Sequence, residues 1–254
     1  MTGRQDATVL VERRGRILLV TLNRPSARNA IDGAVAEELA AAARELDSDP
    51  ELSVGVLTGT GQDFCAGMDL KAFARKEDMS PVVRFIREGT RKPLIAAVEG
   101  HAVAGGLELV LACDLVVAAS DARMGIPEAT VGLFAAGGGL LRLPDRIGSS
   151  LALQMALTGD PVSAERAYAA GFLARLAEPG EAEQEALRLA ERVAHNAPLG
   201  IAASKELIRA GRGMTEAQFW AYQAPLRDQV FTSGDAREGP RAFAEKRPPR
   251  WTGT

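Results

Sequence analysis

The chain has 254 residues, enough for one large domain or two modest ones. Hydrophobic residues make up 46% of it and charged residues 25%, as in an ordinary globular protein. The formal net charge of −3 argues against a nucleic-acid binder whose affinity rests on a basic surface.

Membrane, metal and redox functions find little support in the sequence. No apolar run approaches the roughly 20 residues of a membrane helix, and the first residues, MTGRQDATVL, lack an apolar signal core. Cys65 and Cys113 do not form a CxxC motif, so we expect reduced thiols in a cytoplasmic protein. His101 and His195 lack metal-ligand spacing, and we expect His101 to be a hydrogen-bonded structural residue beyond a strand end.

The first third of the chain alternates strands and helices. Residues 8–12 and 16–22 read as two strands joined by a hairpin turn. Residues 32–47 are rich in helix formers, with Asp32 as a plausible N-cap, and residues 54–59 form a short apolar strand.

The alternation continues to about residue 120. Residues 93–100 and 114–120 read as apolar strands, with a glycine-led helix between them after Gly105 and Gly106. These strands are too continuously apolar to face water, which indicates an α/β fold with a buried sheet. From about residue 149 the pattern becomes helical, and no long flexible linker separates the two regions.

Two glycine-bearing loops follow predicted strands. Gly105 and Gly106 precede a helix, so unpaired backbone N–H groups and the positive end of a helix dipole are expected there. The loop Cys65-Ala66-Gly67-Met68-Asp69 also follows a strand and is expected to open a helix at Asp69. Each loop donating one N–H to the same oxygen would form an oxyanion hole, while two simple tight turns remain the alternative.

Two glutamates lie in predicted first helical turns. Glu108 interrupts the apolar stretch HAVAGGLELVLACD, and Glu128 follows Pro127. An acid in a first turn stabilises the helix dipole by ~0.3–1 kcal/mol, which is the structural alternative for each. A carboxylate in so apolar a stretch is costly to bury unless hydrogen bonds, a partner charge or protonation compensate. The functional alternative is that the two acids are catalytic.

Over nearly its whole length the chain resembles the enoyl-CoA hydratase/isomerase, or crotonase, superfamily. The matching stretches are LNRPSARNAID, VLTGTGQDFCAGMDL, PLIAAVEGHAVAGGLELVLACDLVVAASDARMGIPEATVGL, APLGIAASKELI and EGPRAFAEKRPPRW. The resemblance implies that Met68 and Gly105 each give an oxyanion-hole N–H. It also implies that Glu108 and Glu128, which keep the family's spacing of twenty positions, hold and activate the water that adds to the double bond.

The same resemblance implies contacts with coenzyme A, which is part of the substrate rather than a cofactor. Four cations lie in stretches that resemble CoA-contacting ones, although a solvated surface cation is an equally good interpretation of each: Arg24, Arg28, Lys71 and Lys246. Ala66 belongs to the first loop's CoA-contacting stretch, and Asp69 and Leu70 are expected near the adenine.

Two segments depart from the pattern of simple hydratases. Residues 133–140 read LFAAGGGL where many family hydratases have a Pro-Gly-Ala-Gly-Gly stretch. The segments IPEATVGL, GGGLLRLP and EGPRAFAEKRPPRW look somewhat nearer to carnitinyl-CoA dehydratases. Residues 72–92 fall in a region that varies in the family and often lines the acyl pocket.

The resemblance therefore predicts a crotonase-type α/β fold, a spiral of β-β-α turns over residues 1–195 with a CoA thioester site, followed by a helical trimerisation region over residues 196–254. We expect a homotrimer or homohexamer that is an enoyl-CoA hydratase, with no metal, redox cofactor, nucleic-acid or membrane partner. The alternatives are an isomerase or carnitinyl-CoA dehydratase-like activity on the same scaffold, or a non-catalytic CoA- or RNA-binding relative.

Overall fold

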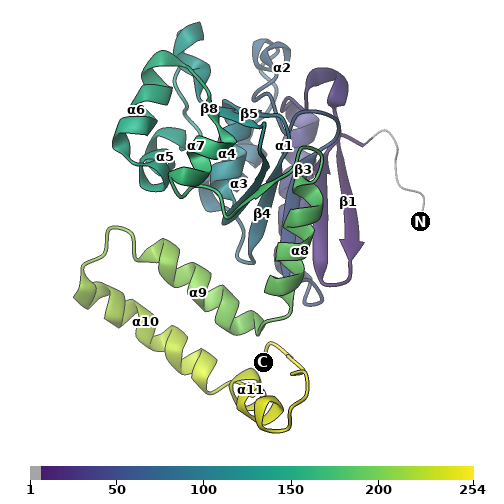
Figure 1. Cartoon of the computed structure of the whole chain (residues 1–254), viewed down its shortest axis with the longest axis vertical. Helices are drawn as coiled ribbons and strands as arrows, with labels where there is room; N and C mark the ends of the chain where they lie inside the picture. Colours follow the sequence, from purple (N-terminus) through teal and green to yellow (C-terminus); the bar gives the residue numbers. More distant parts are fainter. Residues whose placement is uncertain (1–6) are drawn as a thin grey trace.

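A six-stranded sheet forms the centre of the molecule (Figure 1). The computed structural model describes residues 7–254. The strands lie in the order β1 (Val9–Arg14), β2 (Ile17–Leu22), β3 (Val54–Gly59), β4 (Leu94–Val98), β6 (Leu115–Ala119) and β9 (Arg175–Ala177). β1 and β2 form the predicted antiparallel hairpin, and all other neighbours are parallel. The hairpin reverses at Gly15, whose φ of 61° favours a residue without a side chain.

A second, three-stranded sheet stacks successive turns of the chain. It contains β5 (His101–Val103), β7 (Arg123–Gly125) and β8 (Val162–Ser163). β5 directly follows β4, and β7 directly follows β6, so each turn of chain contributes one strand to each sheet. Single-residue parallel pairings, Ile31 with Met68 and Cys65 with Ala102, continue the stacking beyond the named strands. The chain therefore winds as a spiral of strand–strand–helix turns.

Helices cover both faces of the large sheet, which explains why its strands are apolar on both sides. Leu18, Val20 and Leu22 of β2 point into a core shared with α1 (Gly33–Ser48), α3 (Ser80–Glu88) and α4 (Gly105–Ala112). Ile17 and Leu19 point to the opposite face, against α8 (Ala182–Ala194). Successive side chains of a strand alternate between faces, so both sets are buried.

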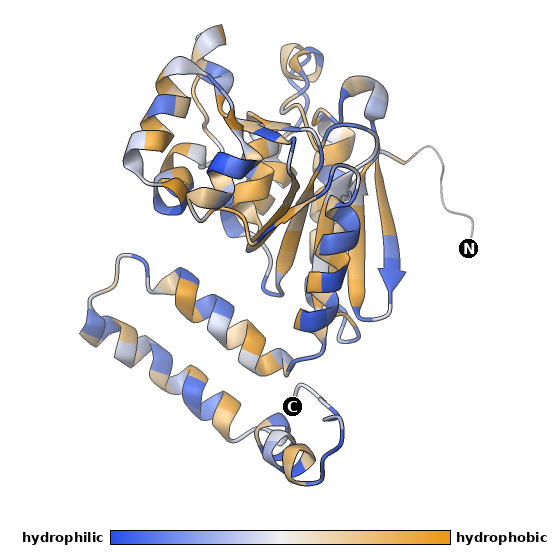
Figure 2. Ribbon diagram, viewed as in Figure 1, coloured by the Kyte–Doolittle hydropathy of each residue, from blue (hydrophilic) through white to orange (hydrophobic). Residues whose placement is uncertain are grey.

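Short helices surround this core, and three longer ones extend from it. The short elements are η1 (Pro25–Ala27), α2 (Leu70–Ala74), η2 (Pro127–Val131), α5 (Gly139–Ile147), α6 (Ser149–Thr158) and α7 (Ala164–Ala169). The yellow-green helices α9 (Pro198–Ala210), α10 (Glu216–Phe231) and α11 (Gly234–Ala244) stand apart from the sheet in Figure 1. Figure 2 shows apolar residues concentrated on the strands, whereas α9 and α10 alternate between apolar and polar residues.

The predicted long elements are confirmed, with ends shifted by at most two residues. Asp32 caps α1 by accepting a 3.0 Å hydrogen bond from Val35 N, and Asp69 caps α2. His101 lies beyond the end of β4 and its Nδ1 is hydrogen-bonded to Asp63, as predicted, and it also begins the short strand β5, which was not predicted. The helical pattern after residue 149 is interrupted by β8 and β9, which are too short to show a period. Within residues 7–254 no helix combines the length and apolarity needed to cross a bilayer.

Candidate active site

The two predicted glycine loops meet in the structure. A side-chain carbon built on Gly105 would lie 3.6 Å from Met68 N and 3.7 Å from Gly67 Cα. A similar carbon on Gly67 would lie 3.2 Å from Gly105 N. The backbone N–H groups of Met68 and Gly105 are therefore close neighbours, contributed by segments almost forty residues apart in the chain.

Local backbone geometry leaves both N–H groups free. Gly67 O accepts a bond from Ile31 N, and Asp69 N donates to Ile31 O, so in this bridge the N–H of Met68 points away from Ile31. Gly105 opens α4, where a helical residue has no intrahelical acceptor for its N–H. Within residues 7–254 neither N–H makes a hydrogen bond.

The turn into α4 depends on Ala104 and Gly106. Ala104 has φ 51° and ψ −129°, a conformation that a residue with a side chain rarely adopts. Its N–H donates to Gly125 O at 2.9 Å, which holds the strained residue against β7. A side chain on Gly106 would come within 2.3 Å of Cys65 O, so only glycine allows the two loops to approach this closely.

Glu108 is buried in the first turn of α4, with 6% of its surface exposed. Its Oε1 accepts a 2.9 Å hydrogen bond from Gly139 N. A side chain on Gly137 would come within 2.4 Å of Oε2, so backbone wraps closely around the carboxylate. Burial raises the pKa of Glu108, and the backbone N–H groups of Gly139 and Gly137 and the charge of Arg142 oppose this rise.

Glu128 lies in η2 and is half-buried. Its Oε2 is buried and has no hydrogen-bond partner among the described residues. Burial raises the pKa of Glu128, and the nearby charge of Glu108 raises it further. The two acids therefore lie within electrostatic reach of each other, as a pair that shares one bound water requires.

Two of the predicted CoA-contacting arginines are already ion-paired. Arg24 already pairs with Asp32 at 3.0 Å and with Asp69 at 3.1 Å, and its side chain is only 20% exposed. Arg28 is largely exposed and pairs with Asp63 at 2.8 Å.

The first loop carries the other predicted contacts. Ala66 N donates to Arg28 O at 2.9 Å, which ties this loop to the Arg24–Arg28 turn. Leu70 and Lys71 are exposed at the start of α2. Lys246 follows α11, which lies at the opposite end of the molecule from α2 in Figure 1, so one chain does not bring Lys246 to this loop.

Sequence reasoning missed the role of the glycines around Glu108. The run Gly137-Gly138-Gly139 is visible in the sequence, but only the fold shows that it closes over a carboxylate from α4. Among residues 7–254 no cluster of three or more His, Cys, Asp or Glu side chains has the arrangement of a metal site.

Comparisons with known proteins agree over almost the entire chain. The family model described as enoyl-CoA hydratase/isomerase matches residues 12–254. Enoyl-CoA hydratase EchA19 of Mycobacterium tuberculosis is 40% identical over 95% of both chains. Carnitinyl-CoA dehydratase of Salmonella typhi is 41% identical over 95% of this chain and 97% of its own. 2,3-Dehydroadipyl-CoA hydratase of Escherichia coli is 37% identical over 96% of this chain and 98% of its own.

A solved structure shares the fold as well. The crystal structure of enoyl-CoA hydratase EchA1 from Mycobacterium marinum aligns with a TM-score of 0.95 and 54% identity, covering 98% of this chain and all of that one. The predicted α/β spiral with helices at its C-terminal end is confirmed by this match.

Proposed function

The chain belongs to the enoyl-CoA hydratase/isomerase, or crotonase, family, and on this basis we propose that it catalyses syn addition of water to a trans-2-enoyl-CoA or the reverse dehydration of a 3-hydroxyacyl-CoA. One observation carries the proposal. Buried Glu108, in the first turn of the helix that Gly105 opens, and half-buried Glu128 both have a raised pKa, and the charge of Glu108 acts on Glu128. Isomerases of the family usually need only one of the two acids, so the presence of both favours hydration.

The backbone pair polarises the substrate. The thioester oxygen accepts hydrogen bonds from Met68 N and Gly105 N, which stabilises the negative charge of the enolate formed when water adds. Removing one such donor in other enzymes costs ~2.7–4 kcal/mol of transition-state stabilisation, so two preset donors are a major contribution.

We infer different roles for the two acids from their environments. Glu108 accepts N–H bonds from the Gly137–Gly139 backbone, which favour its ionised form. Glu128 has an unpartnered buried oxygen and faces the charge of Glu108, which favours its protonated form. In hydration, Glu108 takes a proton from the water whose oxygen bonds to the β-carbon, and Glu128 gives its proton to the α-carbon. Dehydration runs through the same steps in reverse.

A panel of acyl-CoA thioesters tests this function. We expect loss of enoyl absorbance with a gain in mass of one water for at least one trans-2-enoyl-CoA. A shift of the double bond without a mass change would instead identify an isomerase. CoA binding without turnover of any thioester would contradict the proposed activity.

Carnitinyl-CoA dehydration is the second candidate. The 41% identity to carnitinyl-CoA dehydratase of Salmonella typhi favours it, together with the IPEATVGL and GGGLLRLP segments. Including carnitinyl-CoA in the panel separates the two substrates, because the chemistry is the same and only the acyl group differs.

The loop before α2 provides the CoA site in this proposal. Arg24, Arg28, Ala66, Asp69, Leu70 and Lys71 lie on this loop or next to it. Lys246 can reach a CoA only if an assembly brings α11 of one protomer to the loop of another. This requirement fits a trimer or hexamer held together by residues 196–254.

A further inference from the structure

A cavity of about 790 Å³ lies between α5, α9 and the ends of α3 and α4. Glu108 and Glu128 do not line it, so it is separate from the proposed reaction centre. Its lining contains six basic side chains: Arg87, Arg142, Arg146, Lys205, Arg209 and Arg212. Among residues 7–254 two acidic residues face it, Glu88 and Asp114, so its walls carry excess positive charge.

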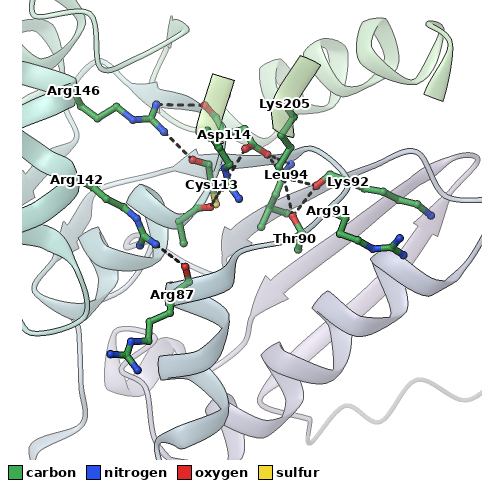
Figure 3. Close-up of polar contacts among 12 residues, drawn as sticks. Arg87, Thr90, Arg91, Lys92, Leu94, Cys113, Asp114, Arg142, Arg146 and Lys205 are labelled. Atoms are coloured by element: carbon green, nitrogen blue, oxygen red, sulfur yellow. Dashed lines mark hydrogen bonds and ion pairs between the residues drawn. The ribbon is translucent and has the colours of Figure 1, made fainter. Parts of the chain in front are cut away.

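The two acidic residues of the lining do not neutralise Arg142 and Arg146. Asp114 pairs with Lys205 at 2.7 Å and with Arg209 at 3.2 Å. Figure 3 shows Asp114 and Lys205 close together, with Arg146 reaching the same region from α5. Glu88 is an exposed residue at the end of α3, so its charge is largely solvated.

Arg142 and Arg146 have only neutral partners. Arg142 Nη2 donates to Arg87 O at 3.0 Å, and Arg146 donates to the carbonyl oxygens of Cys113 and Asp114 at 3.2 and 3.4 Å (Figure 3). Within residues 7–254 no carboxylate lies within 4.0 Å of either guanidinium group. Arg142 Nη1 and Arg146 Nε are buried without any hydrogen-bond partner in this part of the chain.

Such an arrangement is unfavourable without a counter-ion. Burial, and after it the neighbouring cations, lower the pKa of both guanidinium groups, while the charge of Glu108 opposes this for Arg142 and the charge of Asp114 opposes it for Arg146. A buried charge is normally paired, and arginine pairs best with the planar oxygens of a carboxylate or with a phosphate. The cavity therefore has excess positive charge, and neither Arg142 nor Arg146 has a carboxylate partner among the described residues.

We propose that this cavity binds one anionic group, a carboxylate or a phosphate, through Arg142 and Arg146. Its volume is in the range of small-molecule sites. The anion is either a free ion or a carboxylate at the far end of the substrate's acyl chain. The acyl-chain alternative rests on the proposed function. Arg142 connects the two regions, because its charge acts on Glu108 and a side chain on Gly138 would lie 3.4 Å from its Nη1.

Binding of inorganic phosphate and of glutarate to the intact protein, measured by calorimetry, tests the site directly. We expect a saturable isotherm for the parent protein. In Arg146→Met, which loses a charged donor, we expect the dissociation constant to be at least about tenfold higher. Arg44→Met is the matched control, since Arg44 is an exposed arginine of α1 outside the cavity. Arg142→Met gives a second reading should Arg146→Met fail to fold.

The acyl source is tested with two substrates of equal chain length, trans-2-hexenoyl-CoA and the enoyl-CoA that ends in a carboxylate. If the acyl end fills the site, Arg146→Met lowers kcat/KM for the carboxylate substrate at least about tenfold and leaves hexenoyl-CoA unchanged. If a free ion fills it, phosphate binds as above and the substitution leaves the ratio of the two kcat/KM values unchanged.

These experiments test the anion site and the hydratase activity independently. If neither thioester is hydrated, the proposed function is wrong, while the isotherms still decide the anion site. The proposed site would be overturned if the parent binds neither phosphate nor glutarate and if Arg146→Met and Arg142→Met leave the substrate preference unchanged.

Discussion

Gly139 N donates a 2.9 Å hydrogen bond to Oε1 of Glu108. The donor opens α5 and the acceptor lies in the first turn of α4, so the starts of two helices meet at one carboxylate. Both helix N-termini favour negative charge there. This contact keeps a buried acid oriented and supports its ionised form against the effect of burial.

The close approach of Gly137 to this carboxylate gives a first test. In Gly137→Ala the added carbon would start 2.4 Å from Glu108 Oε2, so the carboxylate must move. We expect turnover to fall roughly 10²-fold, the usual effect of displacing a catalytic group by about 1 Å, while CoA affinity stays the same. Parent-like turnover in Gly137→Ala would show that the position of the carboxylate is not critical.

The acid pair itself is tested by Glu108→Gln and Glu128→Gln. Glutamine keeps the shape but cannot exchange a proton, so we expect each variant to lose ~10²–10⁴-fold in turnover in a steady-state hydration assay. Glu37→Gln serves as the control, because Glu37 is an exposed acid of α1. An unchanged rate in either active-site variant removes that residue from the mechanism.

The raised pKa of Glu128 predicts a dependence of stability on pH. A carboxyl group whose pKa is higher in the folded than in the unfolded protein binds more protons when folded. Its contribution to the free energy of unfolding is therefore most favourable below the unfolded pKa and decreases as pH rises through the folded pKa. We expect Glu128→Gln to be more stable than the parent at pH 8 by on the order of 1 kcal/mol. In denaturant titrations the difference should shrink as the pH is lowered towards 4.5, and a pH-independent difference would contradict this linkage.

The oxyanion hole is tested without touching either acid. Gly105→Pro deletes the N–H, and we expect turnover to fall roughly 10²–10³-fold with little change in CoA affinity. Gly105→Ala keeps the N–H, and its added carbon would make ordinary contacts of 3.6 Å with Ile31 Cδ1 and Met68 N. The alanine variant should therefore lose much less. A folded proline variant with the parent rate would show that Gly105 is not a donor to the thioester.

Assembly is predicted from the C-terminal helices. α9 and α10 contain no buried residue within one chain, and Trp220 and Phe231 are 56% and 75% exposed. Aromatic side chains are enriched in interface cores, so we expect a trimer or hexamer in light scattering at micromolar concentration. A monomer at that concentration would contradict the predicted role of residues 196–254.

Local signals in the sequence predicted the helix and strand order well. Asp32 and Asp69 are N-caps in the structure because a short acceptor side chain before a run of helix formers satisfies free N–H groups in almost any context. The strands β5, β7 and β8 have two or three residues each, too few for a periodic pattern, so the second sheet was not predicted.

The candidate site was predicted only in part, for a related reason. The spacing of Glu108 and Glu128 is a property of the sequence, but the contact of Gly139 with Glu108 joins residues 31 positions apart. The unpaired state of Arg142 and Arg146 is likewise a property of the fold, since an i, i+4 arginine pair on a helix is usually solvated.

Met68 belongs both to the proposed oxyanion hole and to the ladder that joins successive turns of the spiral, through its bridge with Ile31. In amide hydrogen exchange, the Ile31 and Asp69 N–H groups form the rungs of this bridge and exchange only when the turns separate. Met68 N–H, between them in the bridge, is unpaired and exchanges from the native state. A thioester oxygen bound to Met68 N–H would slow the exchange of that one amide. The substrate would then supply the hydrogen-bond acceptor that the polypeptide does not provide at this position.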